Sequence, residues 1–103
     1  MALIRALCGS SGGGSMNVQT YTATYGGTPV SVRTQNAIYI MKEMTSSEAS
    51  YHCGYVENGS LTKFIDNNSS VMYVTIDYSS GTLTITNGNQ YYPNMTVLII
   101  TLD

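Results

Sequence analysis

Apolar and polar residues alternate with a period of two along much of the chain, as they do in a strand that buries one face. Residues 71–78 show this best, because Met72, Val74, Ile76 and Tyr78 alternate there with Val71, Tyr73, Thr75 and Asp77. We expect the first set to face the core. Nowhere does an apolar period of 3.6 persist for ten residues, so the pattern predicts an all-β chain.

Short strand-like runs follow one another after residue 16. The expected strands are residues 17–25, 29–32, 37–41, 50–57, 61–65, 71–78, 82–86 and 96–102. This number of strands predicts a small antiparallel β-sandwich or jelly roll. The one helix candidate is Lys42 to Ala49, where Thr45-Ser-Ser-Glu48 resembles a capping box, but a single turn or a loop is favoured there.

Turn residues separate the expected strands. Gly26-Gly27, Asn58-Gly59 and Ser79-Ser80-Gly81 supply the positive backbone angles of tight turns, and they predict three hairpins. After the third turn, Leu83 and Ile85 should point inward. The last run, residues 95–102, is apolar on both faces, which predicts a place in the middle of a sheet or partly in a subunit interface.

The N-terminal residues form an apolar segment that a glycine-serine stretch separates from the rest. Residues 1–8 would be apolar on nearly both faces as a strand, and the linker of residues 9–15 is too flexible to cover them. We therefore predict an anchor segment at 1–8, a linker at 9–15 and a β-sandwich domain at 16–103. In the anchor, Leu3, Ile4 and Leu7 would fill pockets on a partner while its backbone extends that partner's sheet edge.

Composition narrows the classes of partner. The chain has 103 residues, so it is one domain, and residues 16–103 are few enough that help from partner chains is expected. Charged residues make up 10% of the chain, against about 25% in ordinary domains. A net charge of -2 with four Lys and Arg residues argues against nucleic acid binding. No apolar run reaches the length of a membrane span, and the N-terminus is a poor signal peptide.

Few residues suit catalysis or metal binding. His52 is the only histidine, and the carboxylates are scattered. A thiol nucleophile with a base would need His52 and Cys53 to meet, but adjacent strand residues point to opposite faces. A metal site built from His52, Cys53 and Asp66 lacks a fourth ligand. We therefore expect a protein that is not an enzyme, with no catalytic residue, cofactor or metal. Whether Cys8 pairs with Cys53 stays open.

The nine tyrosines are the remaining candidates for ligand binding. Tyrosine has a large apolar face and a hydroxyl, and it suits both sugar stacking and protein interfaces. Tyr91 and Tyr92 lie in a polar loop next to Asn94, so these three residues are a candidate ligand site. A carbohydrate-binding β-sandwich module is therefore the alternative function.

Three features together resemble the small structural proteins, head fibres, tail appendages and decoration proteins, of tailed bacteriophages of gut Firmicutes. They are the opening Met1-Ala-Leu-Ile-Arg-Ala-Leu7, the glycine-rich stretch 9–15, and the Ser80-Gly-Thr-Leu-Thr-Ile85 hairpin before an apolar last strand. The resemblance implies a homotrimer in the virion, assembled in the cytoplasm of the bacterial host. It also implies anchoring to capsid or tail proteins through residues 1–8 and an outward-projecting sandwich. The resemblance identifies no ligand, and a cell-surface glycan is a candidate partner for adhesion. An engineered fusion is a further reading, because residues 9–15 before Met16 look like a designed linker.

Overall fold

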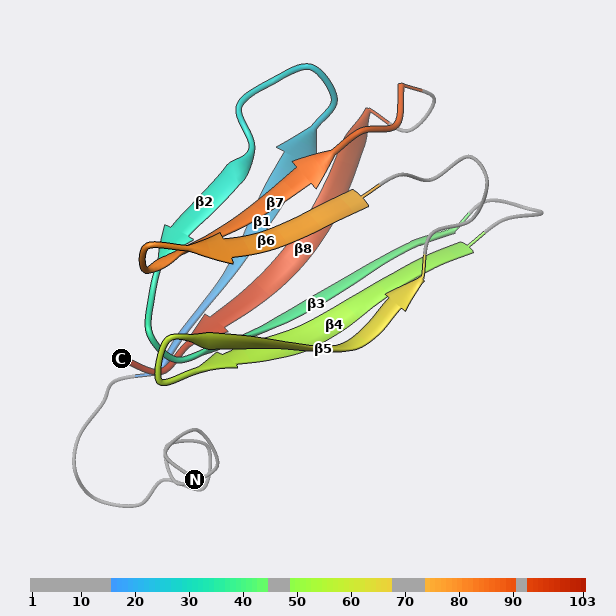
Figure 1. Ribbon diagram of the computed structural model, residues 1–103. Coiled ribbons are helices and arrows are strands. Elements are labelled where there is room, and N and C mark those ends of the chain that lie inside the picture. The colour runs from blue at the N-terminus through green and yellow to red at the C-terminus, as the bar shows by residue number, and fades with distance from the viewer. Residues whose placement is uncertain (1–15, 45–48, 68–73, 91–92) are drawn as a thin grey trace.

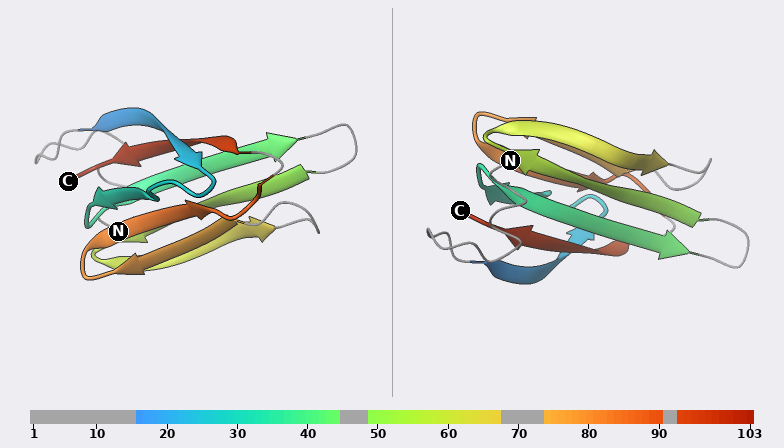
Figure 2. Two further views of the ribbon diagram at one scale, coloured as in Figure 1. Left: turned by 90° about the horizontal axis from the view of Figure 1, so that it is seen from above. Right: turned by 90° about the horizontal axis from the view of Figure 1, so that it is seen from below.

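The computed structural model describes residues 16–44, 49–67, 74–90 and 93–103 of the chain (Figure 1). It contains eight strands: β1 (Asn17–Thr24), β2 (Val30–Arg33), β3 (Ala37–Met44), β4 (Ala49–Glu57), β5 (Ser60–Asn67), β6 (Val74–Ser79), β7 (Thr82–Asn87) and β8 (Asn94–Thr101). They form a five-stranded sheet in the order β1-β8-β3-β4-β5 and a three-stranded sheet in the order β2-β7-β6. Every pairing is antiparallel. The predicted all-β antiparallel sandwich is confirmed, and Figure 2 shows its layers from two opposite sides.

Two of the three predicted hairpins are confirmed. Asn58 and Gly59 have φ of 50° and 76° between β4 and β5, and Ser80 and Gly81 have φ of 51° and 80° between β6 and β7. Positive φ at both central residues is typical of a type I′ turn, whose twist matches that of the two strands it joins.

The hairpin predicted at Gly26-Gly27 is wrong. β1 pairs with β8 and β2 pairs with β7, so this turn carries the chain from one sheet to the other. Gly26 does adopt a φ of 73°, as its position in a turn requires. A glycine thus marks a reversal of direction without deciding which strands pair.

Neither the helix candidate at Lys42 to Ala49 nor the turn or loop favoured there describes the two ends of this range. β3 runs on to Met44 and β4 begins at Ala49, and these two residues face each other in the ladder. Residues 45–48 lie outside the described part of the chain. A helix of so few residues is only marginally stable, and the hydrogen bonds of the continuing β3–β4 ladder are favoured over it.

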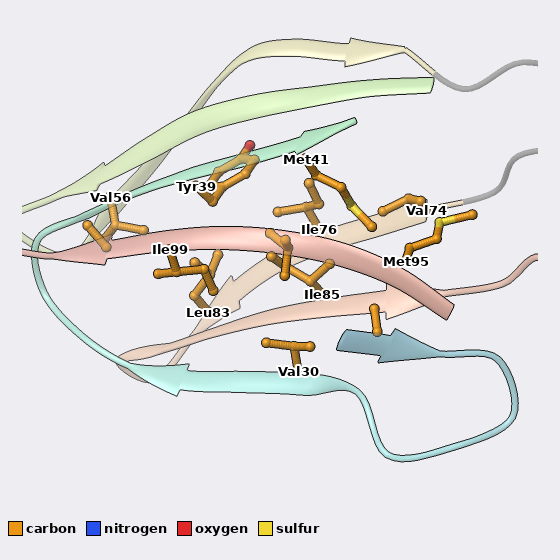
Figure 3. Packing of buried hydrophobic residues seen from close by; sticks show 13 residues of the cluster. Val30, Tyr39, Met41, Val56, Val74, Ile76, Leu83, Ile85, Met95 and Ile99 are labelled. Carbon is orange, nitrogen blue, oxygen red and sulfur yellow. The ribbon is translucent and has the colours of Figure 1, made fainter. Parts of the chain in front are cut away.

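The core lies between the sheets, and side chains from both of them meet there (Figure 3). Its buried residues are Ala23, Val30, Ala37, Tyr39, Met41, Val56, Val74, Ile76, Leu83, Ile85, Met95, Val97 and Ile99. The predicted inward positions in β6 and β7 are confirmed: Val74, Ile76, Leu83 and Ile85 are buried and Tyr78 packs against the cluster. Met72 lies outside the described residues. β8 has neighbours on both sides, as its two apolar faces predicted.

The ring of Tyr39 occupies the space where a side chain at position 54 would be. Tyr39 is fully buried, and an added Cβ at Gly54 would lie 2.6 Å from the Tyr39 hydroxyl oxygen and would clash with the Thr62 carbonyl oxygen. The pairing of β4 with β5 also shifts register between Cys53 and Gly54. Gly54 therefore permits two close approaches at once, from the ring and from the neighbouring backbone.

A carboxylate holds the connection from β2 to β3, which crosses between the sheets at residues 34–36. The backbone N–H groups of Gln35 and Asn36 donate to the Asp103 side chain over 3.0 and 2.9 Å, and the Thr34 hydroxyl donates to its other oxygen. The Leu102 N–H donates to the Asn36 carbonyl over 2.8 Å. The residues after β8 thus fix the crossing, which no strand ladder stabilises.

Replacing Gly54 with Ala should destabilise the fold by roughly 2 kcal/mol, because the new methyl group must displace the Tyr39 ring or the β5 backbone. Urea unfolding followed by circular dichroism measures this change. Gly27→Ala is the matched control, since its Cβ would meet nothing closer than Thr24 at 3.4 Å. An equal loss of stability in both variants would contradict the close packing at Gly54.

Replacing Asp103 with Ala should cost roughly 1–2 kcal/mol of unfolding free energy, because three donors at residues 34–36 lose a charged acceptor. Thermal and urea unfolding check this value. Asp77→Ala removes the same charge from the exposed face of β6 and should change stability by less than about 0.5 kcal/mol. Matching effects would mean that net charge, and not the clamp, explains the loss.

Candidate interaction surface

The outer face of the three-stranded sheet is polar. By strand alternation, the side chains that point away from the core there are Ser31 and Arg33 from β2, Thr75, Asp77 and Ser79 from β6, and Thr82, Thr84 and Thr86 from β7. None of these eight is apolar. This sheet therefore has one apolar face toward the core and one polar face suited to water.

The outer face of the five-stranded sheet is largely apolar, and we call it the apolar face. Its apolar side chains, drawn from all five strands, are Val18, Ile38, Ile40, Tyr51, Cys53, Tyr55, Phe64, Ile65, Leu98 and Ile100. Phe64 is 69% exposed, Val18 is 53% exposed and Ile40 is 47% exposed. Single exposed apolar residues are ordinary on protein surfaces, but a contiguous group marks an interaction site.

The strand register places these side chains in two adjacent rows across the sheet. One row is Val18, Ile100, Ile38, Tyr55 and Thr62, and the next is Thr20, Leu98, Ile40, Cys53 and Ile65. Neither row contains a charged side chain. The centre of the apolar face is therefore a continuous uncharged band that reaches from β1 to β5.

The irregularity in β5 adds an aromatic group to this band. The pairing of β4 with β5 shifts between Cys53 and Gly54, so Phe64 has no partner in the register and its ring packs against Tyr55. The two ring centroids are 5.1 Å apart at an interplanar angle of 57°, a tilted arrangement that aromatic pairs favour. Because Tyr55 points away from the core, Phe64 lies on the apolar face.

Most of the site residues predicted from sequence lie outside the described part of the chain. These are Leu3, Ile4 and Leu7 of the anchor, together with Tyr91 and Tyr92 of the loop. Asn94, the remaining one, begins β8 and is exposed. Its side-chain oxygen accepts a hydrogen bond from the Thr24 hydroxyl over 3.3 Å, so it lies beside the turn after β1.

Tyr25 was missed as a candidate ligand residue. Its N–H donates to the Pro93 carbonyl over 2.8 Å and its side chain is 45% exposed. An exposed aromatic ring and the amide of Asn94 therefore lie at the same end of the sandwich. The sequence pattern placed Tyr25 at the end of a strand and gave no sign that Pro93 lies beside it.

His52 and Cys53 point to opposite sides of β4, as strand geometry predicted. The imidazole of His52 is 1% exposed and faces the space between the sheets, whereas Cys53 belongs to the apolar face. Within residues 16–44, 49–67, 74–90 and 93–103, no three His, Cys, Asp or Glu side chains lie close enough to hold a metal ion. The same ranges contain no helix long and apolar enough to cross a membrane.

Two runs of the sequence that are apolar on both faces contribute to the apolar face. The apolar character of both faces of residues 95–102 predicted either a central place in a sheet, which β8 has, or a part in a subunit interface. The run Ala37-Ile-Tyr-Ile-Met41 has the same property and also contributes Ile38 and Ile40 to the face. The contribution of Phe64 depends on an irregular pairing that no sequence pattern revealed.

Comparison with known proteins identifies a shared fold. No protein-family model matches the chain, and no curated protein sequence matches it. Among solved structures, the chain is similar to tailspike protein gp49 from Acinetobacter baumannii bacteriophage Fri1, a capsular polysaccharide depolymerase, with a TM-score of 0.56 and 12% identity. The similarity covers 85% of this chain but only 17% of the tailspike chain. The chain thus has the fold of one small part of that protein.

Proposed function

We propose that the chain is a non-enzymatic structural protein of a phage virion, a tail-associated appendage or short fibre that projects a trimeric β domain. The observation that carries this proposal is the fold that 85% of the chain shares with part of a phage tailspike. The resemblance of its N-terminal residues to small phage virion proteins supports the same assignment. The chain matches only 17% of a polysaccharide depolymerase, so enzymatic activity is not carried over.

Attachment to the particle is assigned to residues 1–8. Leu3, Ile4 and Leu7 provide apolar side chains for pockets on a virion protein, and the linker of residues 9–15 separates them from the sandwich. Strand addition to an exposed sheet edge suits so short a segment, because backbone hydrogen bonds supply affinity and alternate side chains supply specificity. Three anchors in one trimer strengthen attachment through their high effective concentration.

Deleting residues 1–8 should leave a folded domain that no longer joins particles. The measurement is the number of copies of the chain per purified virion, by mass spectrometry, for the wild type and the deletion. We expect a loss on the order of tenfold or more, because the three tethers are removed together. Circular dichroism of the isolated variant checks that the sandwich is intact.

Point variants test whether attachment needs the apolar side chains of residues 1–8 or only a segment of that length. Replacing Leu3, Ile4 and Leu7 with Ser should reproduce the loss, whereas Ala2→Ser with Ala6→Ser should not, because small side chains fill no pocket. A deletion that unfolds the domain, or a variant that reaches wild-type copy number without its apolar residues, would refute the anchor.

Carbohydrate binding is the second candidate, and it is favoured by the exposed Tyr25 beside Pro93 and Asn94. Aromatic faces stack on sugar rings, and amides bind sugar hydroxyls. If this end of the sandwich binds glycans, the chain should show weak binding on a glycan array. Tyr25→Ala, Tyr91→Ala or Tyr92→Ala should then reduce that binding, while Tyr51→Ala on the apolar face leaves it unchanged. A wild-type chain with no signal on the array would remove this candidate.

A further inference from the structure

We propose that the apolar face, the outer face of the five-stranded sheet, is the surface through which copies of this chain contact one another. The choice of this face rests on the structure of the sheet. The number of copies, three, rests on the proposed function. In that trimer the apolar face points toward the threefold axis.

The two outer faces of the same domain differ, which is the first argument. The three-stranded sheet presents only Thr, Ser, Asp and Arg to its surroundings. The five-stranded sheet presents Ile, Leu, Val, Phe and Tyr, with several Thr beside them and Glu57 at the end of β4. Both faces belong to one chain in one environment. The contrast is explained if another protein surface covers the apolar face while water covers the polar one. Removing water from an apolar face stabilises the assembled state.

The width of the apolar face excludes a short peptide as its cover. Strands lie about 4.8 Å apart and rise about 3.4 Å per residue, so five strands of about eight residues make a face on the order of 24 by 27 Å. One added strand of eight residues would cover about a fifth of that width. The area, on the order of 600 Å², instead approaches the roughly 800 Å² that each partner contributes to a standard protein interface.

The absence of charge from the two central rows favours a second copy over an unrelated protein. Around a threefold axis the equivalent residues of three copies lie closest together at the axis, so a charge at the centre of this face would lie near the like charges of both neighbours. The rows that end in Thr62 and Ile65 contain only apolar and small polar side chains. Thr22 and Thr96 pair in the next row beside the apolar centre, as in interfaces with a polar rim.

Light scattering of the wild type and of two single-residue variants tests the proposal. The wild type should have three times the single-chain mass, and Ile40→Lys should have the single-chain mass, because the new charge lies in the middle of the apolar face. Ile40 is 47% exposed in the single chain, so the domain itself accommodates the lysine. Thr84→Lys, on the outer face of the central strand of the other sheet, is the matched control and should keep the wild-type mass.

Each outcome separates this inference from the proposed function. A dimer that Ile40→Lys dissociates and Thr84→Lys does not would support the apolar face as the contact and overturn the trimer. If the Ile40→Lys variant is still a trimer, the apolar face is not the contact between copies, and the trimer of the proposed function stands. A wild-type chain that stays monomeric at all concentrations would overturn both. If circular dichroism shows that Ile40→Lys is unfolded, Phe64→Lys replaces it, since that ring is 69% exposed on an edge strand.

The thiol of Cys53 locates the contact independently, because it lies directly opposite Ile40 in the register. In a chain with Cys8→Ser, alkylation of Cys53 by iodoacetamide should be at least several-fold slower when the chain is assembled than when it is diluted to single chains. An alkylation rate that does not change on dilution, although the mass falls, would place the contact elsewhere and overturn the proposal.

Discussion

Burial of one face of each sheet against the other is the interaction on which the rest of the structure depends. A strand has two faces, and a sandwich of two sheets uses one face of each. Met95, Val97 and Ile99 point into the core from β8, while Leu98 and Ile100 on the same strand point out. Because the three-stranded sheet covers only the inner face, the outer apolar side chains are at most partly buried in the single chain.

Connections that cross between the sheets need support of a different kind from hairpins. The Asn58-Gly59 and Ser80-Gly81 turns join strands that already pair, so local backbone angles suffice. The crossing at residues 34–36 joins strands in different sheets and depends on Asp103, which is distant in sequence. The stability of this end of the sandwich therefore depends on contacts between the middle of the chain and the residues after β8.

The sequence pattern predicted best where one face of a strand is polar. In β6 and β7 the alternation of Thr with Ile or Leu identified both the strands and their buried sides. In β3 and β8 both faces are apolar, so alternation could not tell the core side from the outer side. The Gly26-Gly27 error has a related cause, because a positive φ is a local property and strand pairing is not. The exposure of Phe64 follows from a register shift between β4 and β5, which no sequence pattern predicts.

The proposed anchor and the apolar face differ in size and therefore suit different partners. Residues 1–8 can present no more than one strand, which suits the edge of a sheet on another protein. The apolar face is five strands wide, which suits another domain. If copies meet through the apolar face, the polar outer face of the three-stranded sheet is turned to solvent, where its Thr and Ser hydroxyls bind water. Association of the domains and attachment of the anchors then use separate surfaces, so neither event competes with the other.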